Sequence, residues 1–332
     1  MSDKKGSELL MSQPLVSVFM PTYNHAEFVR EAIMSAVEQD YPNLELVAGD
    51  DGSTDGTVDI IIECAREYPN RVVALVDQEH LGPTCNANRT LRACRGKYVA
   101  FHSGDDVLLP GKIARQVEWL EADECRVICV HDVDVFDSET GKTQSLYSPP
   151  LKSGQGAAAL VRDGNMFSGG TVMARASALP SYGFDERLPI VSDWKLWIDC
   201  LASGGLFGYV DGIYARYRRH AKNLSADARP SDPSFLARMS DCLATLTLVE
   251  TSYPHLVRYC RNKRAQYLEV ISGWYVMRGE KSNARVYYAS AMKEYLMMTC
   301  ERLPQPMQSA LLAPSFAAVA KRLNRFPNLS NH

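Results

Sequence analysis

Residues 16–57 read VSVFMPTYNHAEFVREAIMSAVEQDYPNLELVAGDDGSTDGT, and this stretch decides the fold. An apolar run at 16–20 predicts a buried strand. At 28–38 the apolar residues recur every three or four positions, which predicts a helix with one buried face. A second apolar run at 44–49 predicts another strand. A strand, a crossover helix and a second strand form the unit from which parallel sheets are built.

The same alternation continues beyond this stretch. We expect a helix at 55–68, a strand at 72–76, a helix at 84–94 and a strand at 97–102. Repeated units of this kind predict an α/β fold whose mainly parallel sheet is covered by helices on both faces.

The second half of the chain has a different pattern. Short strands are expected at 126–131, 171–174, 207–210 and 214–217, and helices at 156–162 and 193–202. A polar linker at 226–232 precedes segments with helical patterns at about 233–252, 254–278, 281–302 and 305–324. We therefore expect an α/β domain at residues 1–228 and a helical C-terminal region at 229–332.

Composition limits the classes of function. The 332 residues are 46% hydrophobic and 23% charged with a net charge of −3, so the basic excess of a nucleic-acid-binding protein is missing. The cysteine count is odd, at nine, and no CxxC pair occurs, which argues against a disulfide framework and for a reducing compartment. The polar N-terminus has no signal-peptide pattern and no run is long enough to span a membrane, so we expect a cytoplasmic protein.

Polar and acidic residues follow three of the expected strands. These ends read Pro21-Thr22-Tyr23-Asn24, Asp50-Asp51-Gly52-Ser53 and Ser103-Gly104-Asp105-Asp106. Ligands of such sheets bind beyond the carboxyl ends of the strands, so we expect the three ends to meet at one cleft. The first strand is not followed by the glycines of GxGxxG, which argues against a nicotinamide dehydrogenase.

Carboxylates at such strand ends suit a divalent cation. Mg²⁺ and Mn²⁺ prefer oxygen ligands and keep positions for phosphate oxygens and water. A cation of this kind stabilises a departing nucleotide diphosphate, and Asp105-Asp106 fits that task. A carboxylate of Asp50 or Asp51 can accept a hydrogen bond from uracil or ribose. Taken alone, each acidic pair is equally well explained as a turn or a helix N-cap.

The order of these motifs resembles the inverting family 2 glycosyltransferases. That family has the GT-A nucleotide-diphospho-sugar transferase fold, which is Rossmann-like with a mixed, mainly parallel sheet. The resemblance covers residues 14–225, roughly two-thirds of the chain, and is carried by residues 16–57, 82–88, 96–99, 103–106, 183–185, 193–197 and 217–220.

The resemblance implies a donor site and a metal site. The expected nucleotide and donor contacts are Pro21, Thr22, Tyr23, Asn24, Asp50, Asp51, Asn88, Gly104, Asp106, Arg218 and Arg219. The expected ligands of Mn²⁺ or Mg²⁺ are Asp105, Asp106 and His220, although a structural role for His220 is equally open. Ser103 and Ala87 depart from the family pattern, because an aspartate and an arginine are usual there.

The catalytic residue implied by the resemblance is Asp193, which follows Ser192 where a glutamate is usual. As a general base it would take the proton of the acceptor hydroxyl, and direct displacement then inverts the anomeric configuration. A competing interpretation makes Asp193 a helix cap or dipole partner. Trp194 and Trp197 are the candidate acceptor-stacking residues, although core packing is the favoured interpretation of both.

The function implied is the metal-dependent transfer of a sugar from a nucleotide diphosphate sugar to a saccharide or lipid-linked glycan in polysaccharide biosynthesis. A UDP-sugar is favoured as the donor over a dTDP- or GDP-sugar. A non-catalytic nucleotide-sugar-binding or assembly protein is the alternative from another class. A sugar nucleotidyltransferase is disfavoured, because residues 21–26 offer no glycine-rich basic loop for a triphosphate. Sugar transfer or donor hydrolysis with Mn²⁺ separates these alternatives.

The C-terminal helices predict a contact surface for an acceptor, a second copy of the chain or a membrane. An apolar stripe is formed by Leu311, Leu312, Phe316, Val319 and Leu323, beside the basic residues Lys321, Arg322 and Arg325. Such a stripe is typical of packing against a neighbouring domain, and a helix lying on a membrane is the other interpretation. We expect weak peripheral association with the cytoplasmic membrane face.

Overall fold

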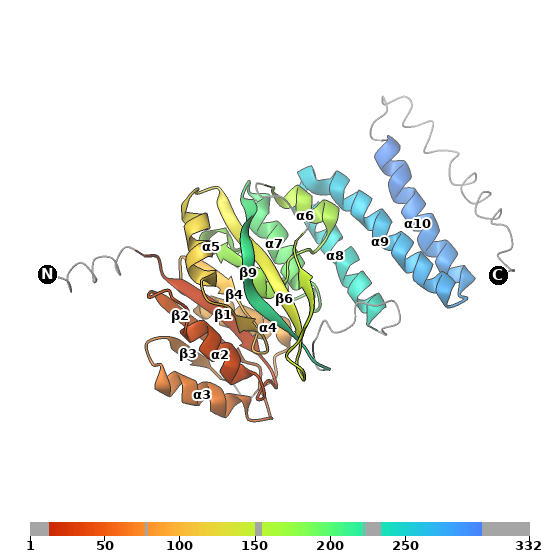
Figure 1. The fold of residues 1–332 in the computed structure, drawn as a ribbon. Coiled ribbons are helices and arrows are strands. Elements are labelled where there is room, and N and C mark those ends of the chain that lie inside the picture. The colour runs from red at the N-terminus through yellow and green to blue at the C-terminus, as the bar shows by residue number, and fades with distance from the viewer. Residues whose placement is uncertain (1–12, 77–78, 150–154, 222, 224–233, 301–332) are drawn as a thin grey trace. The chain divides into compact units, whose positions relative to one another are not determined.

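The protein is described by a computed structural model that covers residues 13–76, 79–149, 155–221, 223 and 234–300. The expected linker at 226–232, the expected helix at 305–324 and its apolar stripe lie outside these residues. The chain forms two compact units, which are described separately (Figure 1). Unit 1 comprises Met1–Leu160 and Asn165–Ala226, and unit 2 comprises Val161–Gly164 and Asp227–His332.

Unit 1 is built on one mixed sheet. In chain order its strands are β1 (Val16–Thr22), β2 (Leu44–Asp50), β3 (Val72–Leu75), β4 (Tyr98–Phe101), β5 (Val107–Leu108), β6 (Arg126–Asp137), β7 (Thr143–Tyr147), β8 (Met173–Arg175) and β9 (Leu206–Arg219). They lie in the order β3-β2-β1-β4-β8-β6-β9-β5, and β7 pairs with β6. The first four strands are parallel, whereas β8 runs antiparallel to β4 and β6.

The helices of this unit connect the strands, and all but α5 are predicted by the sequence pattern. They are α2 (Val29–Val37), α3 (Thr57–Glu67), α4 (Pro83–Ala93), α5 (Lys112–Glu121), α6 (Ala157–Asp163) and α7 (Ser192–Ala202), with short 3₁₀ turns η1 (Gly169–Thr171) and η2 (Ala176–Ala178). Helix α6 straddles the division between the units. The expected mainly parallel α/β architecture is therefore confirmed.

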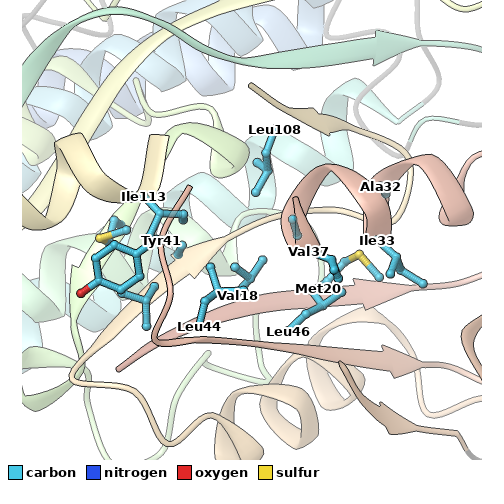
Figure 2. Close-up of a cluster of buried hydrophobic side chains, with 14 of the residues drawn as sticks. Val18, Met20, Ala32, Ile33, Val37, Tyr41, Leu44, Leu46, Leu108 and Ile113 are labelled. Carbon is cyan, nitrogen blue, oxygen red and sulfur yellow. The ribbon is translucent and has the colours of Figure 1, made fainter. Parts of the chain in front are cut away.

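The core follows from the alternation of side chains along β1. Val16, Val18 and Met20 point to one face and pack with Leu46 of β2 and Ile33 of α2, all with no exposed surface (Figure 2). On the opposite face Phe19 contacts Phe101, Phe184 and, through Phe101, Trp197. Each large apolar side chain buried in this way contributes about 1.5–3 kcal/mol. Burial on both faces fixes the register of β1, because a slip by one residue would exchange the two sets.

Several details differ from the expectations. Residues 171–173 pass from η1 into β8 instead of forming one strand. The two strands expected at 207–217 are one strand, β9, which bends at Gly212 (φ 123°) where its register with β6 shifts. Helix α5 and the strands β5 and β7 were not expected at all.

Unit 2 is helical in its described part. It contains α8 (Phe235–Ser252), the 3₁₀ turn η3 (Pro254–Leu256), α9 (Val257–Met277) and α10 (Lys281–Cys300). Helices α9 and α10 form a hairpin that turns at Gly279, whose φ of 76° suits glycine. Arg264 joins the three helices by ion pairs with Glu250 and Glu294. Among the described residues, none of the helices combines the length and apolarity that crossing a bilayer requires.

Candidate active site

The loops that follow β1 and β2 are joined by hydrogen bonds. The backbone N–H of Asn24 donates to Ser53 Oγ (2.8 Å), and Asn24 Oδ1 accepts from the N–H of Thr54 (2.9 Å). Asn24 has a positive φ of 53°, which asparagine tolerates better than most residues. Asp50 closes the second loop, because its two oxygens accept from Ser53 Oγ (2.5 Å) and Ser53 N–H (2.8 Å). Asp50 is fully buried and shapes the loop.

Asp51 lies beside an aromatic pair. The imidazole of His80 stacks on Tyr23 with ring centroids 4.4 Å apart, and its Nδ1 lies 3.0 Å from Asp51 Oδ2. The other oxygen of Asp51 accepts from the N–H of Leu81 (2.8 Å). Tyr23 is 41% exposed, so its ring is accessible to a ligand. Tyr23, Asp51 and His80 therefore form an aromatic and acidic corner that suits a nucleobase.

The β4 end is contacted by residues far along the chain. Asp105 Oδ2 accepts from His220 Nε2 (3.0 Å) and Asn223 Nδ2 (3.2 Å), and Ser103 Oγ donates to Oδ1. His25 Nε2 lies 3.8 Å from the same Oδ2. The carboxylate of Asp105 is thus the meeting point of the loop after β1 and the segment after β9.

Asp106 is held by the backbone of β9. Its Oδ1 accepts from the N–H of Arg218 (2.9 Å), and Arg218 Nε donates to the carbonyl of Asp105 (2.8 Å). The guanidinium of Arg218 also pairs with Glu31, and the residue is only 6% exposed. Arg218 is therefore a buried brace, and the expectation that it neutralises a phosphate is corrected. Arg219 is partly exposed and lies over the ring of Tyr217.

The two adjacent carboxyl groups have opposite electrostatic surroundings. Burial alone would raise the pKa of Asp105, but the hydrogen bonds of His220 and Ser103 and the nearby His25 outweigh it and lower that pKa to about 2. Burial, followed by the charge of Asp105, raises the pKa of Asp106 well above its ordinary value. Burial also lowers the pKa of His25.

Gly104 allows the loops after β1 and β4 to touch. A Cβ placed on Gly104 would lie 2.3 Å from Thr22 Oγ1 and 2.9 Å from His25 Nδ1, so a side chain would force these loops apart. Thr22 and His25 are themselves joined by a 3.0 Å hydrogen bond. Pro21 precedes them in β1, where it pairs in register with Gly49. The ends of β2, β1 and β4 are therefore adjacent, as their order in the sheet requires.

Asp193 lies in the first turn of α7, where its carboxylate contacts Trp194 and Asn165. It accepts from the N–H of Trp194 (2.7 Å), and both of its oxygens lie 3.1 Å from Asn165 Nδ2. Its side chain is not buried. These contacts suit a helix-terminal role and also hold the carboxylate in one orientation, so both interpretations of Asp193 stay open.

Three expected site residues are elsewhere in the structure. Asn88 is 2% exposed, and its amide holds Phe184 by two hydrogen bonds of 2.7 and 2.9 Å, so it is not free to bind a donor. Trp194 and Trp197 are 0% and 1% exposed, and neither offers a ring face to an acceptor. Trp194 Nε1 donates to the carbonyl of Leu160, and Trp197 packs edge-on against Phe101. Core packing replaces the acceptor-stacking role.

Four further residues belong to the site and were missed from the sequence. His25, Asn223, His80 and Asn165 contact the acidic groups described above. His25 and Asn223 had a signal, because they stand one residue after the Tyr23-Asn24 motif and three after His220. His80 and Asn165 are in loops whose positions depend on the folded chain.

The side chains at the β4 end suit a divalent cation for which the protein supplies only some of the ligand atoms. An octahedral Mg²⁺ or Mn²⁺ site has ligands at ~2.1 Å, which places neighbouring ligand atoms roughly 3 Å apart. Asp105 Oδ2 and His220 Nε2 are 3.0 Å apart. Over the described ranges no three His, Cys, Asp or Glu side chains are grouped to hold a metal alone. This arrangement suits a cation whose other positions are taken by phosphate oxygens and water.

Comparisons with known proteins agree with this geometry. The sequence model of glycosyl transferase family 2 matches residues 17–183, half of the chain. EpsE of Bacillus subtilis, which is named as a glycosyltransferase, is 32% identical over 196 residues that cover 58% of this chain and 69% of EpsE. The chondroitin synthase of Escherichia coli is 28% identical over 226 residues, and the match spans 32% of that longer protein.

Two solved structures share the fold. Staphylococcus aureus TarS (residues 1–349), solved with UDP-GlcNAc, superposes with a TM-score of 0.61 at 16% identity, covering 93% of this chain and 88% of TarS. The mannosyltransferase PcManGT of Pyrobaculum calidifontis, solved with GDP-Man and Mn²⁺, gives a TM-score of 0.50 at 18% identity over 95% and 83% of the two chains. With the GT-A fold of these transferases and a family match across half its length, the chain belongs to glycosyl transferase family 2.

Proposed function

We propose that this glycosyltransferase moves a sugar from a UDP-sugar to a hydroxyl of a saccharide or lipid-linked glycan, with inversion at the anomeric carbon. The observation that carries the proposal is the meeting of Asp105 and His220 beside Asp106 at the ends of the strands. The binding of UDP-GlcNAc by TarS and of GDP-Man with Mn²⁺ by PcManGT supports a nucleotide diphosphate sugar as donor.

The residues divide the task of binding the donor. Tyr23 offers a ring for stacking on the base, and Asp51, held by His80, accepts a hydrogen bond from the base or ribose. Arg219 provides a positive charge for the diphosphate. Mn²⁺ or Mg²⁺ bound at Asp105 and His220 would stabilise negative charge on the leaving nucleotide.

Asp193 is proposed as the general base. It takes the proton of the acceptor hydroxyl while the oxygen attacks the face of the sugar opposite the nucleotide, so that the configuration inverts. Asn165 holds the carboxylate in place from the segment before η1. A non-catalytic nucleotide-sugar binder is the second candidate, because Asp193 also satisfies the N–H of Trp194 as a cap would.

The decisive experiment compares Asp193→Asn with the wild type. We expect release of UDP in the presence of acceptor to fall by roughly 10²–10⁴-fold, while the rise in melting temperature on adding UDP and Mn²⁺ is preserved. Asp59→Asn, which changes an exposed acid on α3, is the control and should retain full activity. Wild-type turnover in Asp193→Asn would refute the assignment of the base. Binding without turnover by the wild type, over a panel of UDP-, dTDP- and GDP-sugars, would favour the second candidate.

A further inference from the structure

A buried lysine that contacts the η1 turn has no part in the chemistry described so far. Lys112, the first residue of α5, is 0% exposed and is among the largest fully buried side chains in the protein. Its Nζ lies 3.0 Å from His131 Nε2 and 3.0 Å from the carbonyl oxygen of Gly170. Lysine is rarely buried without a carboxylate partner, because desolvating an ammonium group is costly.

The hydrogen bonds around Lys112 match an uncharged amine. Nδ1 of His131 lies 2.6 Å from the carbonyl of Asp132, so Nδ1 carries the proton and Nε2 offers a lone pair to Lys112. A neutral amine has two N–H groups for the two acceptors, whereas an ammonium group would leave a third proton unsatisfied. Burial lowers the pKa of Lys112 to about 7 and that of His131 well below its ordinary value.

The surroundings of the amine contain no acid that is ionised at neutral pH among the described groups that act on it. From β6 it faces His131 and Cys129, whose pKa burial raises to about 12. His102, which follows β4, also interacts electrostatically with Lys112, and burial lowers the pKa of His102 to about 4. Tyr214 of β9 packs edge-on against His131. His131, Cys129 and His102 are therefore neutral near pH 7 and offer the amine no charged partner.

The carbonyl held by Lys112 belongs to the turn that borders the acidic pair. A Cβ placed on Gly170 would lie 3.6 Å from Asp106 Oδ2, so η1 passes directly beside this carboxyl group. Gln116, one helical turn after Lys112, donates to the carbonyl of Thr171 (2.8 Å) at the end of η1. Two side chains of α5 thus fix the backbone of η1 from inside the core.

We propose that Lys112 is a positioning residue, which as a neutral amine holds η1 against the Asp105-Asp106 pair. This inference rests on the proposed function, because the pair is where the donor diphosphate would bind. A turn displaced by about 1 Å beside reacting groups lowers the rate by up to ~10²-fold. Burying and deprotonating this lysine lowers the stability of the fold. Such a loss of stability is expected for a residue that is retained for activity.

The test uses Lys112→Met, which keeps the length and apolar stem of the side chain. Urea unfolding is measured between pH 7.5 and 9.5. As the pH rises, the equilibrium constant for unfolding of the wild type should fall by roughly tenfold per pH unit relative to that of Lys112→Met. This sign follows because the unfolded lysine binds a proton up to pH ~10.4 and the folded one does not. The kcat for sugar transfer should fall 10–100-fold in Lys112→Met, with little change in the KM for the donor.

Gln116→Leu is the matched variant, since Gln116 holds the same turn but does not titrate. Its kcat should fall as well, without any change in the pH slope of stability. Equal pH slopes for the wild type and Lys112→Met would overturn the neutral amine, and a wild-type kcat in Lys112→Met would overturn the positioning role. If the wild type transferred no sugar, the proposed function and the positioning role would both fail, whereas the pH slope would still decide the charge state.

Discussion

The two edges of the parallel strands each contain buried carboxylates, but with different kinds of partner. At the amino edge, Glu45 of β2 accepts from Ser17 Oγ (2.6 Å), from the N–H of Arg95 (2.8 Å) and from its guanidinium. At the carboxyl edge, Asp105 is contacted by His220 and Asn223. The partners of Glu45 lie 28 and 50 residues away, whereas Asp105 has long-range partners 115 and 118 residues away beside its local partner Ser103.

This difference separates a structural carboxylate from one available for chemistry. Both oxygens of Glu45 are used by a backbone N–H, a hydroxyl and a guanidinium that join β1, β2 and the turn before β4. One oxygen of Asp105 accepts from the nearby Ser103 hydroxyl, but the other accepts from an imidazole and an amide, groups that can turn to a cation or a phosphate instead. We therefore expect changes at the carboxyl edge to affect turnover and changes at the amino edge to affect stability.

The largest effect is expected for Asp105→Asn. Loss of the carboxylate weakens cation binding and removes stabilisation of the leaving nucleotide, so kcat/KM should fall by roughly 10³-fold. The rise in melting temperature produced by UDP with Mn²⁺ should disappear, and circular dichroism at the assay temperature should show a folded chain. A folded variant that retains wild-type kcat/KM would remove the distinction between the two edges.

The fold was largely predictable because β1, β2 and α2 have clear periodicity, and their bounds differ from expectation by one or two residues. Helix α5 was missed because Lys112 and Gln116, both fully buried, interrupt its apolar face. Strand β7 was missed because all its residues are exposed, so no alternation marks it.

The site was only partly predictable for a related reason. The acidic strand ends follow from topology, since β1 lies between β2 and β4. The contacts of His80 and Asn165 depend on tertiary structure and leave no sequence signal. For Trp194 and Trp197 the favoured interpretation, core packing, agrees with the burial of residues 194–201 of α7. They were also named as acceptor candidates because no sequence pattern distinguishes a buried tryptophan from one that faces a ligand.

The second prediction concerns the amino edge. Glu45→Gln retains the size of the side chain but loses the charge that Arg95 and Ser17 stabilise, so the free energy of unfolding should fall by about 2 kcal/mol. Arg95 is largely exposed, which limits the effect. Urea unfolding at pH 7 measures the loss, and kcat/KM should stay within twofold of the wild type. A much larger loss of kcat/KM in a fully folded variant would show that this edge also affects catalysis.

The smallest expected effect is the pH dependence of the difference in unfolding free energy between the wild type and Glu45→Gln. Burial alone would raise the pKa of Glu45, but the hydrogen bonds from Ser17 and Arg95 outweigh it and hold that pKa below 4.5. The unfolded carboxylate therefore protonates first, so the stabilisation is present above about pH 4.5 and is lost as pH falls through the folded pKa. Glu45→Gln cannot titrate. The difference in unfolding free energy between the wild type and this variant should be constant from pH 7 to 5 and shrink below pH 4.5. A difference that instead grew with acid would mean that Glu45 is protonated in the folded protein, and that burial outweighs its partners.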